Sequence, residues 1–77
     1  MPKLRVISGK KLVSILEKEG FSIVRIKGSH VILDAPNKPD AVVVLLHKEI
    51  DRGTLHSIIK TLESLVPPKF IETNFYR

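Results

Sequence analysis

The sequence predicts an α+β domain whose elements follow the order α-β-β-β-α. Two segments with apolar residues at helical spacing enclose three short β-branched segments that are bounded by turn residues. The strands therefore form an antiparallel meander, and two helices cover one of its faces. A length of 77 residues, 43% of them apolar, fits a single domain over residues 1–77.

The first helix is predicted over Gly9–Glu19. Ser8 is a residue type that caps helix N-termini, and Gly20 offers the left-handed conformation that ends a helix. Apolar residues between them fall on one helix face, namely Leu12, Ile15 and Leu16.

Three strands are predicted over Phe21–Lys27, Val31–Leu33 and Ala41–Leu46, because each segment is rich in β-branched or aromatic residues. Pro36–Asp40 connects the second strand to the third, since two prolines within four residues cannot serve a sheet ladder. The third strand is then an edge strand with apolar residues on both faces.

A second helix is predicted to begin at a cap provided by Asp51 or Thr54. It is expected to end near Val66, because Pro67–Pro68 cannot continue a helix. Its apolar positions at helical spacing are Leu55, Ile58, Ile59, Leu62 and Leu65. The tail over residues 67–77 has no clear assignment. It either packs back on the body or engages a partner, and packing is favoured because exposed aromatic clusters are uncommon.

A tight hairpin is predicted between the first two strands. Gly28 and Ser29 fit a two-residue type II′ turn, which has glycine at its first central position. Lys27 then pairs directly with His30. The remaining pairs of this register are Ile26 with Val31, Arg25 with Ile32, and Val24 with Leu33.

Side chains alternate along a strand, so this hairpin has two unlike faces. The open face carries His30, with Lys27 directly across and Arg25 on the diagonal. Ile23 and Ile32 are expected to add apolar area to it. The opposite face is wholly apolar and is expected to form the helix-covered core, with Val24, Ile26, Val31 and Leu33.

His30 on this basic face is a candidate for RNA cleavage without a metal. RNA carries its own nucleophile, the 2′-hydroxyl, so the enzyme needs a proton-transfer group and cations that stabilise charge on the phosphate. Arg25 and Lys27 are the candidate phosphate contacts. Lys10 and Lys11 are a candidate second backbone contact at a helix N-terminus, where anions are favoured, although they fit a solvated helix face equally well.

The charge distribution indicates a polyanionic partner. Residues 1–30 carry seven Lys or Arg and two Glu, whereas residues 31–77 carry six bases and six acids. The absence of cysteine excludes disulfides and thiolate chemistry, and the histidine spacings match no familiar metal-ligand pattern. The longest apolar run is far too short to span a membrane. A soluble cytoplasmic protein with no metal and no cofactor is expected.

Five short motifs resemble one known family in their order and spacing. They are Ser8-Gly9-Lys10, Gly20-Phe21, Lys27-Gly28-Ser29-His30, His47, and Gly53-Thr54-Leu55. Together they are similar to the HicA family of mRNA interferase toxins from prokaryotic toxin–antitoxin systems, over about residues 8–65. The resemblance implies a double-stranded-RNA-binding-domain-like fold, cleavage of mRNA by His30 with Gly28 and Ser29 as its turn, and neutralisation by a HicB-type antitoxin.

Two other functions stay open at this point. A non-catalytic RNA-binding module would use the same basic face, and a protein-interaction module would use the edge strand Ala41–Leu46. For an RNA enzyme with a protein inhibitor, that edge is also a natural docking site beside His30, unless the tail folds over it. The free protein is expected to be a monomer or a weak dimer.

Overall fold

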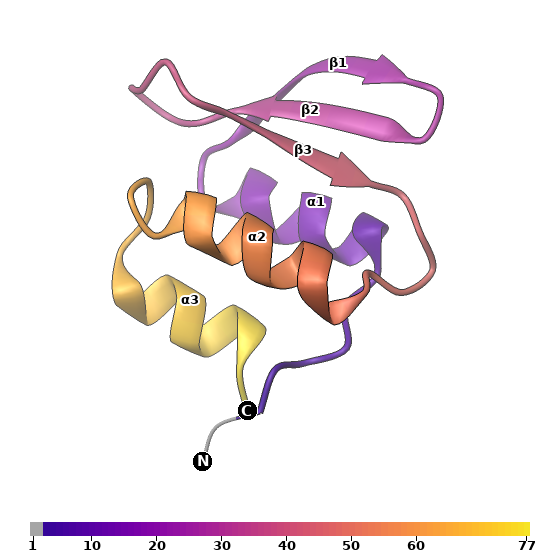
Figure 1. Ribbon diagram of the computed structural model, residues 1–77. Helices are drawn as coiled ribbons and strands as arrows, with labels where there is room; N and C mark the ends of the chain where they lie inside the picture. The colour runs from indigo at the N-terminus through magenta and orange to yellow at the C-terminus, as the bar shows by residue number, and fades with distance from the viewer. Residues whose placement is uncertain (1–2) are drawn as a thin grey trace.

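Figure 1 shows the computed structural model, which describes residues 3–77. The helices and strands are α1 Gly9–Lys18, β1 Ser22–Lys27, β2 His30–Asp34, β3 Ala41–Leu45, α2 Arg52–Leu62 and α3 Pro68–Phe75. The predicted α+β class and α-β-β-β-α order are confirmed, and a third helix follows them. The strand bounds need small corrections: β1 begins one residue later than predicted, β2 extends one residue further at each end, and β3 ends one residue earlier.

The elements are stacked in three layers (Figure 1). The strands lie in the order β1-β2-β3 and neighbours are antiparallel, as in a meander. α1 and α2 lie beneath one face of the sheet and α3 lies beneath these two helices, while the opposite sheet face forms the top of the molecule in this view. Buried side chains from all three layers form one core cluster.

The ends of α1 follow the local sequence. The Ser8 Oγ accepts a hydrogen bond from the Lys11 backbone N–H at 3.0 Å. The chain leaves the helix one residue before the predicted end and passes through Gly20, whose φ of +103° is readily adopted by glycine. The predicted apolar face is buried, and Leu12 and Leu16 are completely inaccessible.

Asp51 is the residue that caps α2. Its carboxylate accepts hydrogen bonds from the Thr54 N–H at 3.0 Å and from the Thr54 hydroxyl at 2.7 Å. The predicted end near Val66 is wrong, since the helix ends at Leu62. The N–H groups of Leu65 and Val66 both donate to the Leu62 carbonyl, at 2.8 and 2.9 Å, which closes the last turn and leaves both side chains buried.

The β1–β2 hairpin has the predicted turn. Gly28 has a φ of +60°, and Ser29 is not among the residues with a positive φ, which is the pattern of a type II′ turn. The predicted register is confirmed next to the turn. The pairs there are Lys27 with His30, Ile26 with Val31, and Arg25 with Ile32.

The register changes one pair further along. A β-bulge at Val24 gives β1 an extra residue, so Leu33 pairs with Ile23 and the predicted Val24–Leu33 pair is wrong. Directly paired residues share a face, and Leu33 is fully buried. Ile23 therefore lies on the helix side of the sheet, and the prediction that it adds apolar area to the open face is wrong.

Val24 and Ile26 are exposed, although the sequence predicts both in the core. Their exposed fractions are 54% and 61%, whereas Val31 and Leu33 on the next strand are buried. All six residues of β1 are exposed, while alternate residues of β2 and β3 are buried. The helices therefore cover β2 and β3 and leave this outer strand open on both faces.

The tail packs back on the body, as favoured from the sequence. Pro68 begins α3, where a missing N–H costs nothing, and Ile71 and Phe75 are buried in the core. Backbone hydrogen bonds then join the segment after α3 to the N-terminal segment: the Lys3 N–H donates to the Arg77 carbonyl and the Arg77 N–H to the Lys3 carbonyl, each at 2.9 Å. Because α3 lies on the helix side (Figure 1), the alternative in which the tail folds over the β3 edge is wrong.

Candidate active site and nucleic-acid interface

His30 is the first residue of β2 and follows directly on the Gly28–Ser29 turn. It pairs with Lys27 of β1 on one side and with Leu45 of β3 on the other. The next residue, Val31, is buried on the helix side, so His30 belongs to the open face, where it is exposed. The structure thus places this side chain on the predicted face.

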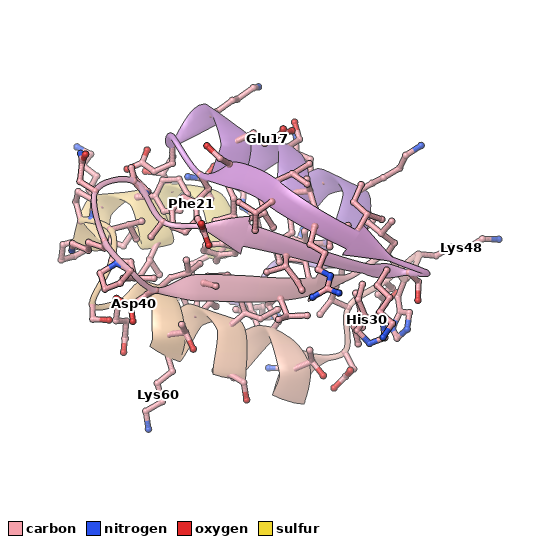
Figure 2. The ribbon with its side chains drawn as sticks, turned by 90° about the horizontal axis from the view of Figure 1, so that it is seen from above. Glu17, Phe21, His30, Asp40, Lys48 and Lys60 are labelled. Carbon is pink, nitrogen blue, oxygen red and sulfur yellow. The ribbon has the colours of Figure 1, made fainter. Side chains whose placement is uncertain are left out.

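Residues of all three strands form a shallow hollow around His30. Its volume is about 450 Å³, and it is lined by Arg25, Lys27, His30, Ile32 and Val43. Ile32 forms the middle of this lining, because it pairs with Arg25 on one side and with Val43 on the other. Three predicted site residues therefore come together over an apolar floor. Figure 2 looks onto this face of the sheet.

A second hollow lies where the chain leaves β3 and meets the start of α1. Its volume is about 390 Å³, and its lining is Ser8, Lys10, Leu46, His47 and Lys48. Figure 2 shows Lys48 at the same end of the sheet as His30. Of the two predicted lysines at the start of α1, Lys10 lines this hollow and Lys11 lines neither hollow.

Backbone contacts hold the chain between the two hollows. The Leu46 N–H donates to the Ser29 carbonyl at 2.8 Å, and the Gly9 N–H donates to the His47 carbonyl at 2.9 Å. A Cβ atom on Gly9 would overlap the Leu45 carbonyl oxygen, so α1 approaches the end of β3 as closely as glycine allows. The backbone of His47 is thereby anchored close to the hairpin turn.

His47 is the chemically capable residue near the site that the sequence analysis did not place there. The predicted third strand was the feature of the sequence that could have indicated this position of His47. When that strand pairs with β2, its C-terminal end lies beside the hairpin turn. A two-residue loop fixes which residues face each other, but the longer connection through Pro36–Asp40 does not. The position of His47 relative to His30 therefore could not be read before the β2–β3 register was known.

Both hollows are basic. Within residues 3–77, their linings contain Arg25, Lys27, Lys10 and Lys48 and neither Asp nor Glu. A carboxylate does lie within electrostatic range of the second hollow. The pKa of Asp51 is lowered chiefly by its hydrogen bonds from Thr54, and the proximity of His47 makes the smallest contribution in the same direction.

The third histidine, His56, lies apart from the other two. It is exposed on α2 and lines a separate hollow with Lys60 and Tyr76. Across residues 3–77, no three His, Cys, Asp or Glu side chains gather closely enough to hold a metal ion. The groups that do gather are imidazoles and cations, which can move protons and bind phosphates.

A comparison with protein families decides the class to which this arrangement belongs. The family model described as HicA toxin of bacterial toxin-antitoxin matches residues 9–63. The chain belongs to the HicA toxin family. The matched residues span α1, the whole sheet and α2, and they include every predicted site residue of this HicA protein. Comparisons with curated proteins and with solved structures give no match.

Family membership confirms the resemblance drawn from the sequence motifs. This HicA protein is the toxin of a toxin–antitoxin system, and a cognate antitoxin is its partner. α3 lies beyond the matched residues. No helix in the described part of the chain is both long enough and apolar enough to cross a membrane.

Proposed function

We propose that this HicA toxin is an endoribonuclease that cleaves mRNA in the cytoplasm without a metal ion or cofactor. The observation that carries the proposal is the place of His30, which is exposed on the open sheet face in a hollow with Arg25 and Lys27. Cleavage of a phosphodiester needs a group that moves a proton and cations that stabilise charge on the phosphate. Both are present in this hollow.

The proposed reaction uses the nucleophile that RNA carries. A base takes the proton of a 2′-hydroxyl, and the oxygen attacks the adjacent phosphorus. The bond from phosphorus to the 5′-oxygen of the next nucleotide breaks, and that oxygen takes up a proton. The products end in a 2′,3′-cyclic phosphate and a 5′-hydroxyl. His30 is the proposed proton-transfer group, Arg25 and Lys27 are the proposed phosphate contacts, and Gly28 and Ser29 hold His30 at the turn.

The RNA backbone is proposed to continue from the His30 hollow to the start of α1. Lys10 lines the second hollow, which lies at the same end of the sheet as His30, and the positive end of the α1 dipole favours anions there. The geometry supports Lys10 more directly than Lys11, whose side chain lines neither hollow.

The antitoxin is proposed to be a HicB-type protein that covers the His30 face and meets the edge at Ala41–Leu46. Three observations support this docking site: β3 is an outer strand, the tail leaves its edge free, and Val43 is 49% exposed. Exposed apolar edges favour aggregation unless a partner covers them. Acidic residues at the rim of the partner would be attracted by Arg25 and Lys27.

A substrate that lacks one 2′-hydroxyl tests the proposed function. The site of cleavage is first mapped on an mRNA fragment in EDTA, and an oligonucleotide is then made with a single deoxyribose on the 5′ side of that bond. We expect the all-ribose oligonucleotide to be cut at this bond and the substituted one to stay whole while binding equally well. Cleavage of the substituted oligonucleotide at the same rate would overturn the proposed reaction, and an mRNA fragment that is bound but never cut would favour the non-catalytic RNA-binding module and overturn the nuclease.

A further inference from the structure

We propose that His47 is the general acid of this toxin, acting on the 5′-oxygen while His30 acts as the base on the 2′-hydroxyl. The inference rests on the proposed RNA cleavage and adds the second proton-transfer group that the reaction requires. Its basis is the junction between β3, the hairpin turn and α1, where the backbone holds the two histidines close together.

The β2–β3 register sets the place of His47. His30 pairs with Leu45, and the hydrogen bond from the Leu46 N–H to the Ser29 carbonyl extends this pairing past the last residue of β3. His47 comes next and stands two positions beyond the partner of His30. Within an antiparallel ladder, diagonal neighbours lie about 7–8 Å apart, and the Leu46–Ser29 bond keeps the chain beside the hairpin turn up to the residue before His47.

The hydrogen bond from the Gly9 N–H to the His47 carbonyl fixes the other side of this position. His47 is therefore flanked by one contact to the turn that carries His30 and by one contact to α1. Both imidazoles are exposed, and each lines a hollow at this end of the sheet. A phosphate between the hollows would have one imidazole on the side of the attacking oxygen and the other on the side of the leaving oxygen.

The two histidines have different charged neighbours. His30 has the cations Lys27 and Arg25 as neighbours in its hollow. Lys10 on α1 and Lys48 beside it in the chain line the same hollow as His47, and the Asp51 carboxylate at the start of α2 lies within electrostatic range of it. A phosphate bound between the two hollows would therefore meet cations from both of them.

His30 and His47 exchange one proton each with the RNA during the reaction. The His30 nitrogen takes the 2′ proton as the oxygen–phosphorus bond forms, and the His47 nitrogen gives its proton to the 5′-oxygen as the other phosphorus–oxygen bond breaks. The cyclic phosphate and the 5′-hydroxyl then leave, and water returns each histidine to its starting protonation state.

A substrate with sulfur in place of the leaving 5′-oxygen tests the assignment, because a thiolate leaves without a proton. We expect the His47→Ala variant to cleave the ordinary RNA about 10²- to 10⁴-fold more slowly than wild type. The same variant is expected to cleave the sulfur-bridged RNA at close to the wild-type rate. His30→Ala is expected to cleave both substrates slowly. His56→Ala, which changes a residue of the far hollow, is expected to cleave both at the wild-type rate. The fall in wild-type rate at high pH should also disappear in His47→Ala, since an acid must be protonated to act.

Three results separate the possible failures. Full activity of His47→Ala on ordinary RNA overturns this inference and leaves the proposed nuclease intact. An equal loss on both substrates also overturns it, because His47 would then serve binding or shape, which RNA affinity and circular dichroism of His47→Ala and His47→Gln would show. A wild-type protein that leaves both RNAs whole overturns the inference together with the proposed function.

Discussion

Arg25 and Lys27 are exposed cations on one face of β1, where each can neutralise a phosphate of a passing RNA strand. Each neutralised phosphate releases condensed counterions, so binding weakens as salt rises. We expect Arg25→Ala and Lys27→Ala to lower RNA affinity and each to reduce the log–log salt slope by about 0.7. Lys60→Ala, on α2 beside the far hollow, is the matched control. Unchanged slopes in both strand variants would place the phosphate contacts elsewhere, with Lys10 the next candidate.

Asp51 links the stability of this toxin to pH. Its hydrogen bonds from Thr54 lower the pKa of the folded-state carboxyl below the ordinary value of 3.8. A group with a lowered folded pKa stabilises the fold above its unfolded pKa, and this stabilisation is lost as pH falls through the folded value. We expect Asp51→Ala to unfold at a lower urea concentration than wild type at pH 7, with the two midpoints converging as pH falls below 3.8. Circular dichroism measures both urea midpoints. A difference between them that stays constant over this pH range would contradict the role of the charged carboxylate.

At the scale of the elements, the junction of α1 with β3 is tightly packed. A Cβ atom on Gly9 would lie 2.7 Å from the Leu46 Cα and would overlap the Leu45 carbonyl oxygen, and these are backbone atoms that cannot rotate away. We expect Gly9→Ala to destabilise the fold by about 1–3 kcal/mol, the usual cost of overpacking. Gly53→Ala, where the nearest contact is 3.4 Å, is the control. Urea unfolding measures both, and equal stability of the two variants would show that the junction adjusts freely.

The elements that could be predicted from the sequence are those set by local chemistry. The Gly28–Ser29 turn fixed the register of its nearest pairs, and Ser8 and Gly20 marked the limits of α1, because each acts on residues within a few positions. The bulge at Val24 and the exposure of Ile26 depend on how far the helices extend beneath an outer strand. How far the helices extend is a tertiary property, and the alternation of apolar residues along one strand does not predict it.

At the scale of the whole molecule, α3 was the element that the sequence did not predict. Its eight residues begin at the second of two prolines, and only Ile71 and Phe75 are buried, so the helical pattern is short and weak. Its packing on the helix side matters for function, because it leaves the β3 edge and the His30 face uncovered (Figure 1). The candidate site was predictable as far as the first hairpin, and its His47 part required the fold.

The free β3 edge allows a test of antitoxin docking. Val43 is 49% exposed, so Val43→Glu places a charge on this strand with little loss of core packing. We expect this variant to stay folded and to bind the co-expressed antitoxin at least tenfold more weakly than wild type, about 1.4 kcal/mol. Thr73→Glu, an exposed change on α3 away from this edge, tests whether any added negative charge has the same effect. Unaltered affinity of folded Val43→Glu would show that the inhibitor does not use the β3 edge.

His30 is proposed to act in RNA cleavage without a metal ion, and a comparison of its alanine variant with wild type tests this role. Purified wild type, His30→Ala and His56→Ala are incubated with the same mRNA fragment in EDTA, and the rate of fragment formation is measured. We expect wild type and His56→Ala to cut at the same rate and His30→Ala to be slower by about 10²- to 10⁴-fold, because it lacks the proton-transfer group. All three should have the same circular dichroism, since His30 is an exposed side chain outside the core. A folded His30→Ala that cuts at the wild-type rate would contradict the account.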